Sequence, residues 1–273
     1  MNASTNCCAK KQRWLSIIVL MVILQGQQVA AQDLPKPATL NRTQKEPDFS
    51  GYAEMNYYRH YLWRGAEFGN NNVAQPELMM KYKKVGLLLS ANMNYDTQHL
   101  PEYYTKKTVY DEQDVELNYA NEKGRLEYKA AAMFYFYFHQ SNTPNTGELY
   151  WRLKYPIAGD LKVFTETAHD IVYYPGAIFN NTGLVWEKDV SENLTAECTL
   201  AAGFANKKFN TAYNELEKGQ MNIINGKAEL EYSFKKFFVG LMAEWNQYSS
   251  RRLRESTGLN KTNNYYFSFG VNF

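Results

Sequence analysis

Alternation of apolar and polar side chains near the end of the chain constrains its fold more than any other feature. In residues 265–273 every second side chain is apolar, and most of those between are small or polar. The apolar face consists of Tyr265, Phe267, Phe269, Val271 and Phe273. A period of two residues is typical of a β-strand whose two faces meet different environments. Residues 237–246 and 227–234 repeat the pattern, so the end of the chain predicts an antiparallel sheet.

The same alternation recurs upstream, and no helical period of useful length is present from Phe49 onward. The predicted strands are residues 53–61, 76–82, 87–95, 115–119, 126–138, 149–155, 161–171, 177–187, 194–204, 227–234, 237–246 and 265–273. An even number of strands of about ten residues, apolar on one face, is typical of outer-membrane barrels. The sequence therefore predicts an all-β fold, a closed antiparallel transmembrane β-barrel of about twelve strands. Pro76 is expected at the start of its strand, where a missing N–H does least harm.

The connections between the predicted strands alternate in length, which is an independent indication of the same fold. Short connections lie at residues 83–84, 121–124, 156–160, 188–193 and 235–236. Those between them are mostly longer, at residues 62–72, 96–110, 139–146, 205–220 and 249–263, with 174–176 as a short exception. Outer-membrane barrels have short periplasmic turns and long external loops. With both chain ends in the periplasm, the short set falls on the periplasmic side throughout.

A soluble β-sandwich is the main structural alternative, because its strands alternate as well. A sandwich buries its apolar faces and requires neither a terminal phenylalanine nor aromatic residues at strand ends. Tyrosine and tryptophan prefer the interface between membrane and water, and the chain contains 22 Tyr. The aromatic surplus therefore favours the barrel.

The N-terminus has the parts of an export signal. A basic stretch, an apolar core and a small-residue cleavage site are formed in turn by Lys10, Lys11 and Arg13, by residues 14–24, and by Val29 and Ala31. The apolar core is too short to span a bilayer as a helix. We predict a signal peptide over residues 1–31, a flexible periplasmic leader over 32–48 and a barrel over 49–273. The predicted location is the outer membrane of a Gram-negative bacterium.

Cleavage of the signal changes the cysteine count. Cys7 and Cys8 fall inside the signal, so only Cys198 remains and no internal disulfide is possible. The neighbours of Cys198 indicate a small apolar group that faces lipid. The formal net charge of +2 is too close to neutral to indicate a nucleic-acid partner.

Two stretches resemble known proteins. Residues 265–273 resemble the C-terminal insertion signal of outer-membrane barrels, whose final aromatic residue is recognised by the barrel-assembly machinery. The first hairpin contains YLWRG (61–65) and QPEL (75–78), and it resembles the start of the TorF-type porin family. This match covers a small part of the chain. The resemblance implies a pore-like barrel, with membrane lipid, the assembly machinery and small polar solutes as partners. It carries over no binding residues.

If the apolar face meets lipid, the charged side chains of the opposite face line the barrel interior. They are Glu54, Glu77, Lys81, Asp114, Glu116, Glu127, Lys129, Arg152, Lys154, Glu166, Asp170, Glu187, Glu197, Lys227, Glu229, Glu231 and Glu244. Twelve of these are acids and five are bases, and rings of carboxylates attract cations and repel anions. The set predicts a narrow pore for small cationic or neutral hydrophilic solutes. The alternative is an interior closed by ion pairs of Glu127 and Lys129 with Arg152 and Lys154.

Trp63 and Arg64 are expected where the first strand leaves the outer interface. The favoured interpretation makes Trp63 an interfacial aromatic residue and places Arg64 in a turn with Gly65. In the alternative interpretation, Arg64 folds into the mouth, pairs with an interior acid such as Glu77 and shapes a constriction.

Two other function classes were weighed. A hydrolase needs a serine nucleophile beside a histidine base, and the nearest candidate, His139 with Ser141, lies in an expected external loop without flanking glycines. His169 and Asp170 lack further metal ligands at useful spacing, and no nucleotide fingerprint is present. We therefore predict no enzyme activity, no cofactor and no metal. The other class is a binding or adhesion barrel that acts through its long external loops at 205–220 and 249–263.

Overall fold

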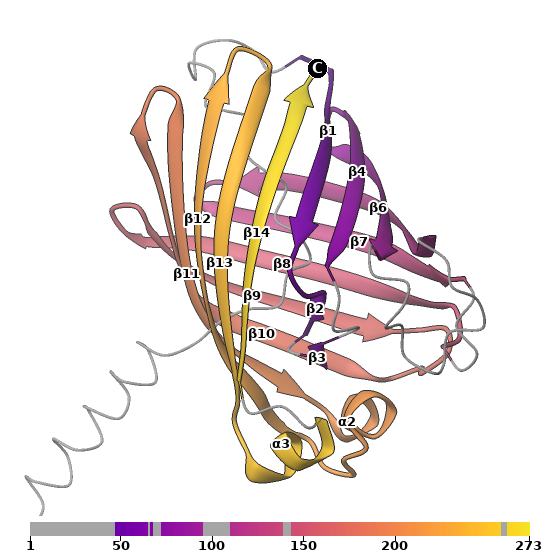
Figure 1. Cartoon of the computed structure of the whole chain (residues 1–273). Helices are drawn as coiled ribbons and strands as arrows, with labels where there is room; N and C mark the ends of the chain where they lie inside the picture. Colours follow the sequence, from indigo (N-terminus) through magenta and orange to yellow (C-terminus); the bar gives the residue numbers. More distant parts are fainter. Residues whose placement is uncertain (1–46, 65, 68–71, 95–109, 139–142, 258–260) are drawn as a thin grey trace, which may run out of the picture.

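Twelve antiparallel strands close into a barrel in the computed structural model, which describes residues 47–64, 66–67, 72–94, 110–138, 143–257 and 261–273 (Figure 1). The barrel strands are β1 (Phe49–Tyr58), β4 (Val73–Tyr82), β5 (Val85–Asn94), β6 (Tyr110–Lys123), β7 (Leu126–Tyr137), β8 (Thr146–Ala158), β9 (Leu161–Asp170), β10 (Ile178–Ser191), β11 (Leu194–Ala205), β12 (Gln220–Phe234), β13 (Phe237–Tyr248) and β14 (Lys261–Asn272). Neighbours in sequence are neighbours in the sheet, and β1 closes the barrel by pairing with both β4 and β14. The predicted fold class and strand number are confirmed.

The two faces of the wall carry opposite chemistry, as the alternation predicts. On β13 the outward side chains of Phe237 and Leu241 are 63% and 61% exposed, whereas the inward Phe238 between them is 2% exposed. The outward face of β14 is likewise aromatic, with Phe267 and Phe269 exposed. An apolar outer surface on a closed sheet is the arrangement that a lipid environment requires, because no unpaired backbone edge remains.

The seam between β1 and β14 is held by the last residue. The N–H of Gly51 donates to the carbonyl oxygen of Phe273, and the N–H of Phe273 donates to that of Gly51, both at 2.9 Å. The ring of Phe273 lies 6.3 Å from that of Phe49. The C-terminus therefore lies beside the start of β1 at one end of the barrel (Figure 1).

Two-residue turns join the strand pairs at this same end. The turns β4–β5, β6–β7, β8–β9, β10–β11 and β12–β13 each contain two residues. The first residue has a positive φ in four of them, at Lys83, Gly124, Gly159 and Lys235. Such turns match the right-handed twist of paired strands. The predicted alternation of short and long connections is confirmed for the described residues.

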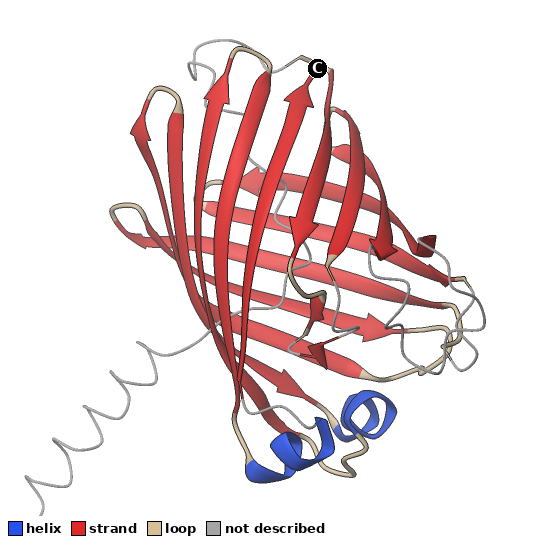
Figure 2. Ribbon diagram, in the orientation of Figure 1, coloured by secondary structure: helices blue, strands red, loops and turns tan. Residues whose placement is uncertain are grey.

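Two short helices, for which the sequence shows no helical period of useful length, lie at the opposite end of the barrel. These are α2 (Lys207–Asn214) and α3 (Arg251–Thr257), which lie in two of the long connections (Figure 2). They escape a search for periodicity because they have only eight and seven residues. A capping residue makes α2 possible, since the Asn206 side chain accepts a hydrogen bond from the N–H of Phe209 at 2.9 Å.

Pro76 lies inside β4 and not at its start, which corrects its predicted position. The pairing of β4 with β5 runs from Ala74 opposite Met93 to Glu77 opposite Ser90, and it omits Pro76. The strand tolerates proline because the register continues unchanged beyond the gap.

Among the described residues, no helix combines the length and the hydropathy of a membrane-spanning helix. The predicted signal peptide and nearly all of the predicted leader lie outside the described residues.

Deletion of Phe273 is expected to weaken closure of the barrel, because it removes two backbone hydrogen bonds and one aromatic contact. At about 1 kcal/mol per hydrogen bond, the free energy of unfolding should fall by roughly 2 kcal/mol. Urea unfolding in detergent measures this change in the free energy of unfolding. The folded fraction at each urea concentration is read from the mobility difference between boiled and unboiled protein in gels. Phe273→Tyr keeps the ring and the backbone and serves as the control. Equal stability of the deletion variant and the control would contradict the assigned role.

Candidate functional site: the barrel interior

The predicted interior residues lie on the inner wall. Their side chains are mostly buried or half-buried, while the apolar residues that alternate with them face outward. The interior holds a cavity of about 110 Å³. Eight carboxylates line it, from Glu54, Glu77, Asp114, Glu116, Glu148, Glu166, Glu229 and Glu244, but only two bases, Arg64 and Lys227. An excess of carboxylates around a cavity of low polarisability makes its potential negative.

Ion pairs link strands along the inner wall of the barrel. Glu127 and Lys129 stand opposite Lys154 and Arg152 in the strand register. However, Glu127 pairs with Lys162 of β9, and Lys129 pairs with Glu116 of β6, each at 2.6 Å. The inner wall is concave. The side chains of Lys129 and Lys162 therefore reach carboxylates that do not stand opposite them in the strand register. The predicted pairs of Glu127 and Lys129 with Arg152 and Lys154 stay predictions.

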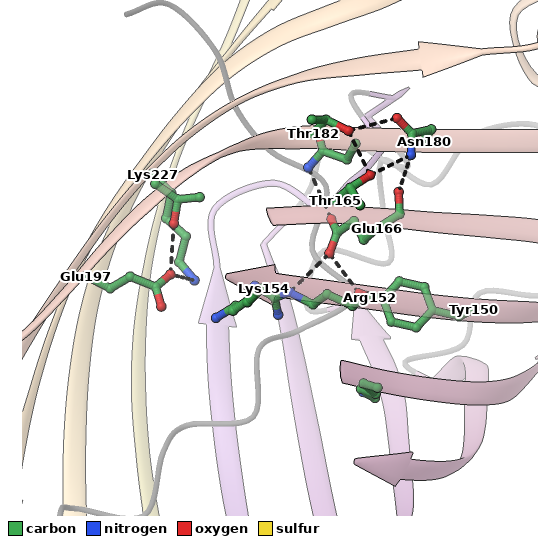
Figure 3. Close-up of polar contacts among 12 residues, drawn as sticks. Tyr150, Arg152, Lys154, Thr165, Glu166, Asn180, Thr182, Glu197 and Lys227 are labelled. Carbon is green, nitrogen blue, oxygen red and sulfur yellow. Dashed lines mark hydrogen bonds and ion pairs between the residues drawn. The ribbon is translucent and has the colours of Figure 1, made fainter. Parts of the chain in front are cut away.

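Two further groups complete this network, and Figure 3 shows Lys227 beside Glu197 in one of them. Lys154 contacts Glu187 at 2.6 Å, and Lys162 reaches the other oxygen of Glu187 at 2.7 Å. Lys227 lies between Glu229 at 2.7 Å and Glu197 at 3.6 Å, and its side chain is 3% exposed. Each of these bases is thereby neutralised by carboxylates.

Three cavity carboxylates have no ion pair with a base among the described residues: Glu54, Glu77 and Glu244. Glu77 accepts hydrogen bonds from the Asn56 amide at 3.1 Å and from the Tyr52 hydroxyl at 3.4 Å. Glu54 stands directly opposite Glu77 in the pairing of β1 with β4. Because like charges face each other there, this side of the cavity is the part of the interior best suited to attract a mobile cation.

Asp170 differs from the other predicted interior residues. Its carboxylate accepts a hydrogen bond from Thr146 at 2.6 Å and from the backbone N–H groups of Val172 and Tyr174 at 3.0 Å. Asp170 therefore fastens the outer turn after β9, and it does not line the cavity.

The segment after β1 enters the mouth, where it forms the small hairpin of β2 (Leu62–Trp63) and β3 (Ala66–Glu67). At one end the Asn264 side chain of β14 holds the backbone of His60. Its oxygen accepts from the His60 N–H at 3.2 Å, and its nitrogen donates to the His60 carbonyl at 2.7 Å. At the other end Arg64 forms a two-pronged ion pair with Glu148 of β8. Six steps around the barrel separate β14 from β8, so the segment reaches from one wall to the opposite wall.

Aromatic rings enclose the Arg64 guanidinium. Its central carbon lies 4.2 Å from the ring centre of Trp63 and 5.7 Å from that of Phe209 in α2. Trp63 in turn contacts the rings of Phe209 and Tyr213 at 5.9 and 5.0 Å. Burial raises the pKa of Tyr213 and the nearby Glu148 carboxylate raises it further, although Arg64 acts in the opposite direction. Tyr213 therefore stays neutral at physiological pH.

This arrangement corrects part of the favoured interpretation of Trp63 and Arg64, although Arg64 does lie in the turn between β2 and β3, as predicted. Trp63 packs against Phe209 of α2, so it is not an aromatic residue of the membrane interface. Arg64 is 9% exposed. In the alternative interpretation Arg64 folds into the mouth and pairs with an interior acid, as observed. The acid is Glu148, however, and not the predicted Glu77.

Sequence reasoning missed Glu112, Glu148 and Lys162, all of which lie on the inner wall. Glu112 accepts a hydrogen bond from Asn92, and Glu148 also accepts one from the Tyr135 hydroxyl at 2.9 Å. His139 and Ser141, the nearest candidates for the hydrolase alternative, lie outside the described residues. Within the described ranges, no group of three histidine, cysteine or acidic residues is placed to hold a metal ion.

Comparison with solved structures places this geometry among known folds. A KdgM porin matches with a TM-score of 0.52 and 9% identity, covering 81% of this chain and 99% of the porin. A NanC porin matches with a TM-score of 0.53 and 11% identity, covering 81% and 98%. The chain has the fold of outer-membrane channels. An outer-membrane channel from Pseudomonas putida F1 matches as well, with a TM-score of 0.51, 10% identity and coverage of 86% and 99%.

Sequence comparisons add no closer relative. No family model and no curated protein matches the sequence. The resemblance to the TorF-type porins therefore stays a prediction.

Proposed function

We propose that the protein is an outer-membrane porin that lets small hydrophilic solutes diffuse passively and favours cations over anions. The barrel fold and its apolar outer surface support a position in the outer membrane, since exported barrels of this kind are built for that bilayer. The observation that carries the proposal is the charge of the cavity, which eight carboxylates and two bases line. The function involves no covalent step.

The width of the proposed pore follows from the arrangement of the barrel interior. Twelve strands stand between small barrels that side chains fill and large porins with an open aqueous channel. The segment that carries Trp63 and Arg64 obstructs the outer mouth, and the ion pairs of Lys154, Lys162 and Lys227 occupy the wall below it. The proposed pore is therefore narrow and selects by size as well as by charge.

Single-channel recording in planar lipid bilayers tests the proposal. The purified, refolded protein is expected to give small, uniform current steps in potassium chloride. In a salt gradient the reversal potential should show that potassium permeates more readily than chloride. A correctly folded barrel that gives no current, or one that prefers chloride, would refute the proposal.

Glu54→Gln together with Glu77→Gln is expected to lower the ratio of potassium to chloride permeability severalfold. The reason is that these two carboxylates face the cavity without a basic partner among the described residues. The barrel should remain folded, because the substitutions remove a repulsion between like charges on paired strands. Glu192→Gln, in an exposed turn at the opposite end from the helices, is the matched control and should leave the reversal potential unchanged. An unchanged ratio in the double variant would exclude these residues as the source of selectivity.

A second function, binding of a partner through the external loops, is favoured by one observation. The loops that hold α2 and α3 share an ordered core formed by Phe209, Leu216 and Leu253. Loops that share such a core can present a fixed surface to a partner. Exchange of residues 206–219 for a short linker, with conductance retained and partner binding lost, would support this function.

A further inference from the structure

Several hydrogen-bond donors that line the cavity in the barrel interior are already engaged by the wall itself. The Asn56 amide nitrogen donates to Glu77 at 3.1 Å. The Tyr150 hydroxyl donates to Glu166 at 2.7 Å (Figure 3), and the Asn181 amide nitrogen donates to the other oxygen of Glu166 at 3.1 Å. All five residues line the cavity, so these donors are not available to a solute inside it.

Acceptor atoms around the same cavity have capacity left. The Asn181 side chain is 1% exposed, and its amide oxygen has no hydrogen-bond partner among the described residues. Buried polar atoms without a partner are rare in native proteins, and they indicate an ordered water, an ion or a ligand. Glu244 accepts a hydrogen bond from Asn246 at 2.9 Å, although an ionised carboxylate can accept about four. Together with Glu54 and Glu77, these groups offer a solute acceptors more than donors.

Apolar surface lies beside these carboxylates. Tyr58 of β1 and Tyr266 of β14 stand opposite each other in the register, and their ring centres are 4.7 Å apart. Met242 of β13 stands opposite Tyr266 on the other side. All three side chains line the cavity together with Glu54, which lies on the same strand as Tyr58. Aromatic faces attract cations and also contact alkyl groups, so the cavity suits a cation that carries an apolar part.

We propose that the cavity binds primary ammonium ions with a short alkyl chain, the form that small organic amines take at neutral pH. A primary ammonium group has three N–H donors and no acceptor, so it complements a cavity whose free capacity is for donors. Its charge complements Glu54, Glu77 and Glu244, and its alkyl chain contacts the rings of Tyr58 and Tyr266. A potassium ion has no apolar part, and a neutral polyol needs donors from the wall as well as acceptors. Small amines are thereby the class of cation that the proposed porin favours, so the assignment rests on the proposed function.

Calorimetric titration of the folded, full-length mature barrel in detergent tests this assignment, with the heats from empty micelles subtracted. The two probes are the chlorides of butylammonium and tetramethylammonium. These cations are isomers of equal charge, but only butylammonium has N–H groups. Butylammonium is expected to bind at least about tenfold more tightly, because charge-assisted hydrogen bonds add to the Coulomb attraction that both cations share. Equal affinities, tighter binding of tetramethylammonium, or no binding of either cation would overturn the proposal.

Three variants separate hydrogen bonding from charge. Asn181→Leu removes an acceptor but no charge, so it should weaken butylammonium binding severalfold and leave tetramethylammonium binding unchanged. Glu54→Gln with Glu77→Gln removes charge and should weaken the binding of both cations. Glu192→Gln, in an exposed turn, is the control and should change neither affinity. An Asn181→Leu variant that bound both cations as the natural protein does, or that lost both equally, would overturn the proposal.

Potassium current in planar bilayers is read separately, so the two proposals can fail independently. A barrel that conducts potassium but binds the two isomers equally would overturn the amine site and leave the porin intact. A folded barrel that prefers butylammonium but gives no current would refute the porin and support the amine site.

Discussion

Replacing Arg64 with alanine is expected to raise the single-channel conductance severalfold. Arg64 is the side chain that ties the mouth segment to β8, through both oxygens of Glu148. Without the guanidinium, Glu148 keeps a buried charge with no base beside it, and breaking such a pair costs roughly 3–5 kcal/mol. Water that enters the mouth would solvate the Glu148 carboxylate and so lower this free-energy cost. The segment should then move away from β8 more readily, because the ion pair no longer fixes Arg64 to Glu148.

Arg59→Ala is the matched control for this prediction. Arg59 lies on the same segment, but its side chain is exposed, so its loss should leave the conductance unchanged. The double variant Arg64→Ala with Glu148→Gln should conduct as well as Arg64→Ala and be more stable, since the unpaired charge is gone. Conductance in Arg64→Ala equal to that of the natural protein would show that the segment does not limit the current.

Lys227→Met is expected to cause the largest loss of stability. Lys227 is 6% exposed and lies between Glu197 and Glu229, so its removal takes away the base that contacts both carboxylates. The expected loss is roughly 3–5 kcal/mol in the free energy of unfolding, the usual cost of breaking a buried ion pair. Urea unfolding in lipid vesicles, followed by tryptophan fluorescence, measures it.

Two variants show whether the loss arises from uncompensated charge. Adding Glu197→Gln and Glu229→Gln to Lys227→Met should restore most of the stability, because the two carboxylates that lost their base are then gone. Lys207→Met breaks an ion pair with Glu217 whose side chains are 62% and 78% exposed, and its effect should stay within about 1 kcal/mol. If Lys227→Met destabilised the barrel no more than Lys207→Met, the interior network would not support the fold.

The fold could be predicted from the sequence because membrane and interior impose opposite demands on alternate residues. In β13 and β14 large apolar side chains such as Leu241 and Phe269 face outward at every second position. The pattern is weaker in β9 and β10, since their outward positions include Thr165, Thr167 and Asn180. The predicted strand at residues 161–171 nevertheless agrees with β9 to within one residue.

The interior could be predicted only in part. Glu112 and Glu148 were missed because β6 and β8 begin several residues before the predicted strands, where residues such as Gly147 do not mark the outward face. The pair of Arg64 with Glu148 joins residues 84 positions apart. Alternation within a strand carries no information about a segment that folds back through the mouth. The partners of Glu127 and Lys129 depend on the curvature of the wall, which strand register alone does not describe.

Spin labels placed one at a time at positions 237 to 246 of β13 test the central claim most directly, with the barrel in lipid vesicles and in a Cys198→Ser background. Accessibility to oxygen, which dissolves in lipid, should be high at Val239, Leu241 and Ala243 and low at Gly240, Met242 and Glu244. The reverse pattern, or accessibility without alternation, would show that the apolar face does not meet lipid and would contradict the barrel and its function together.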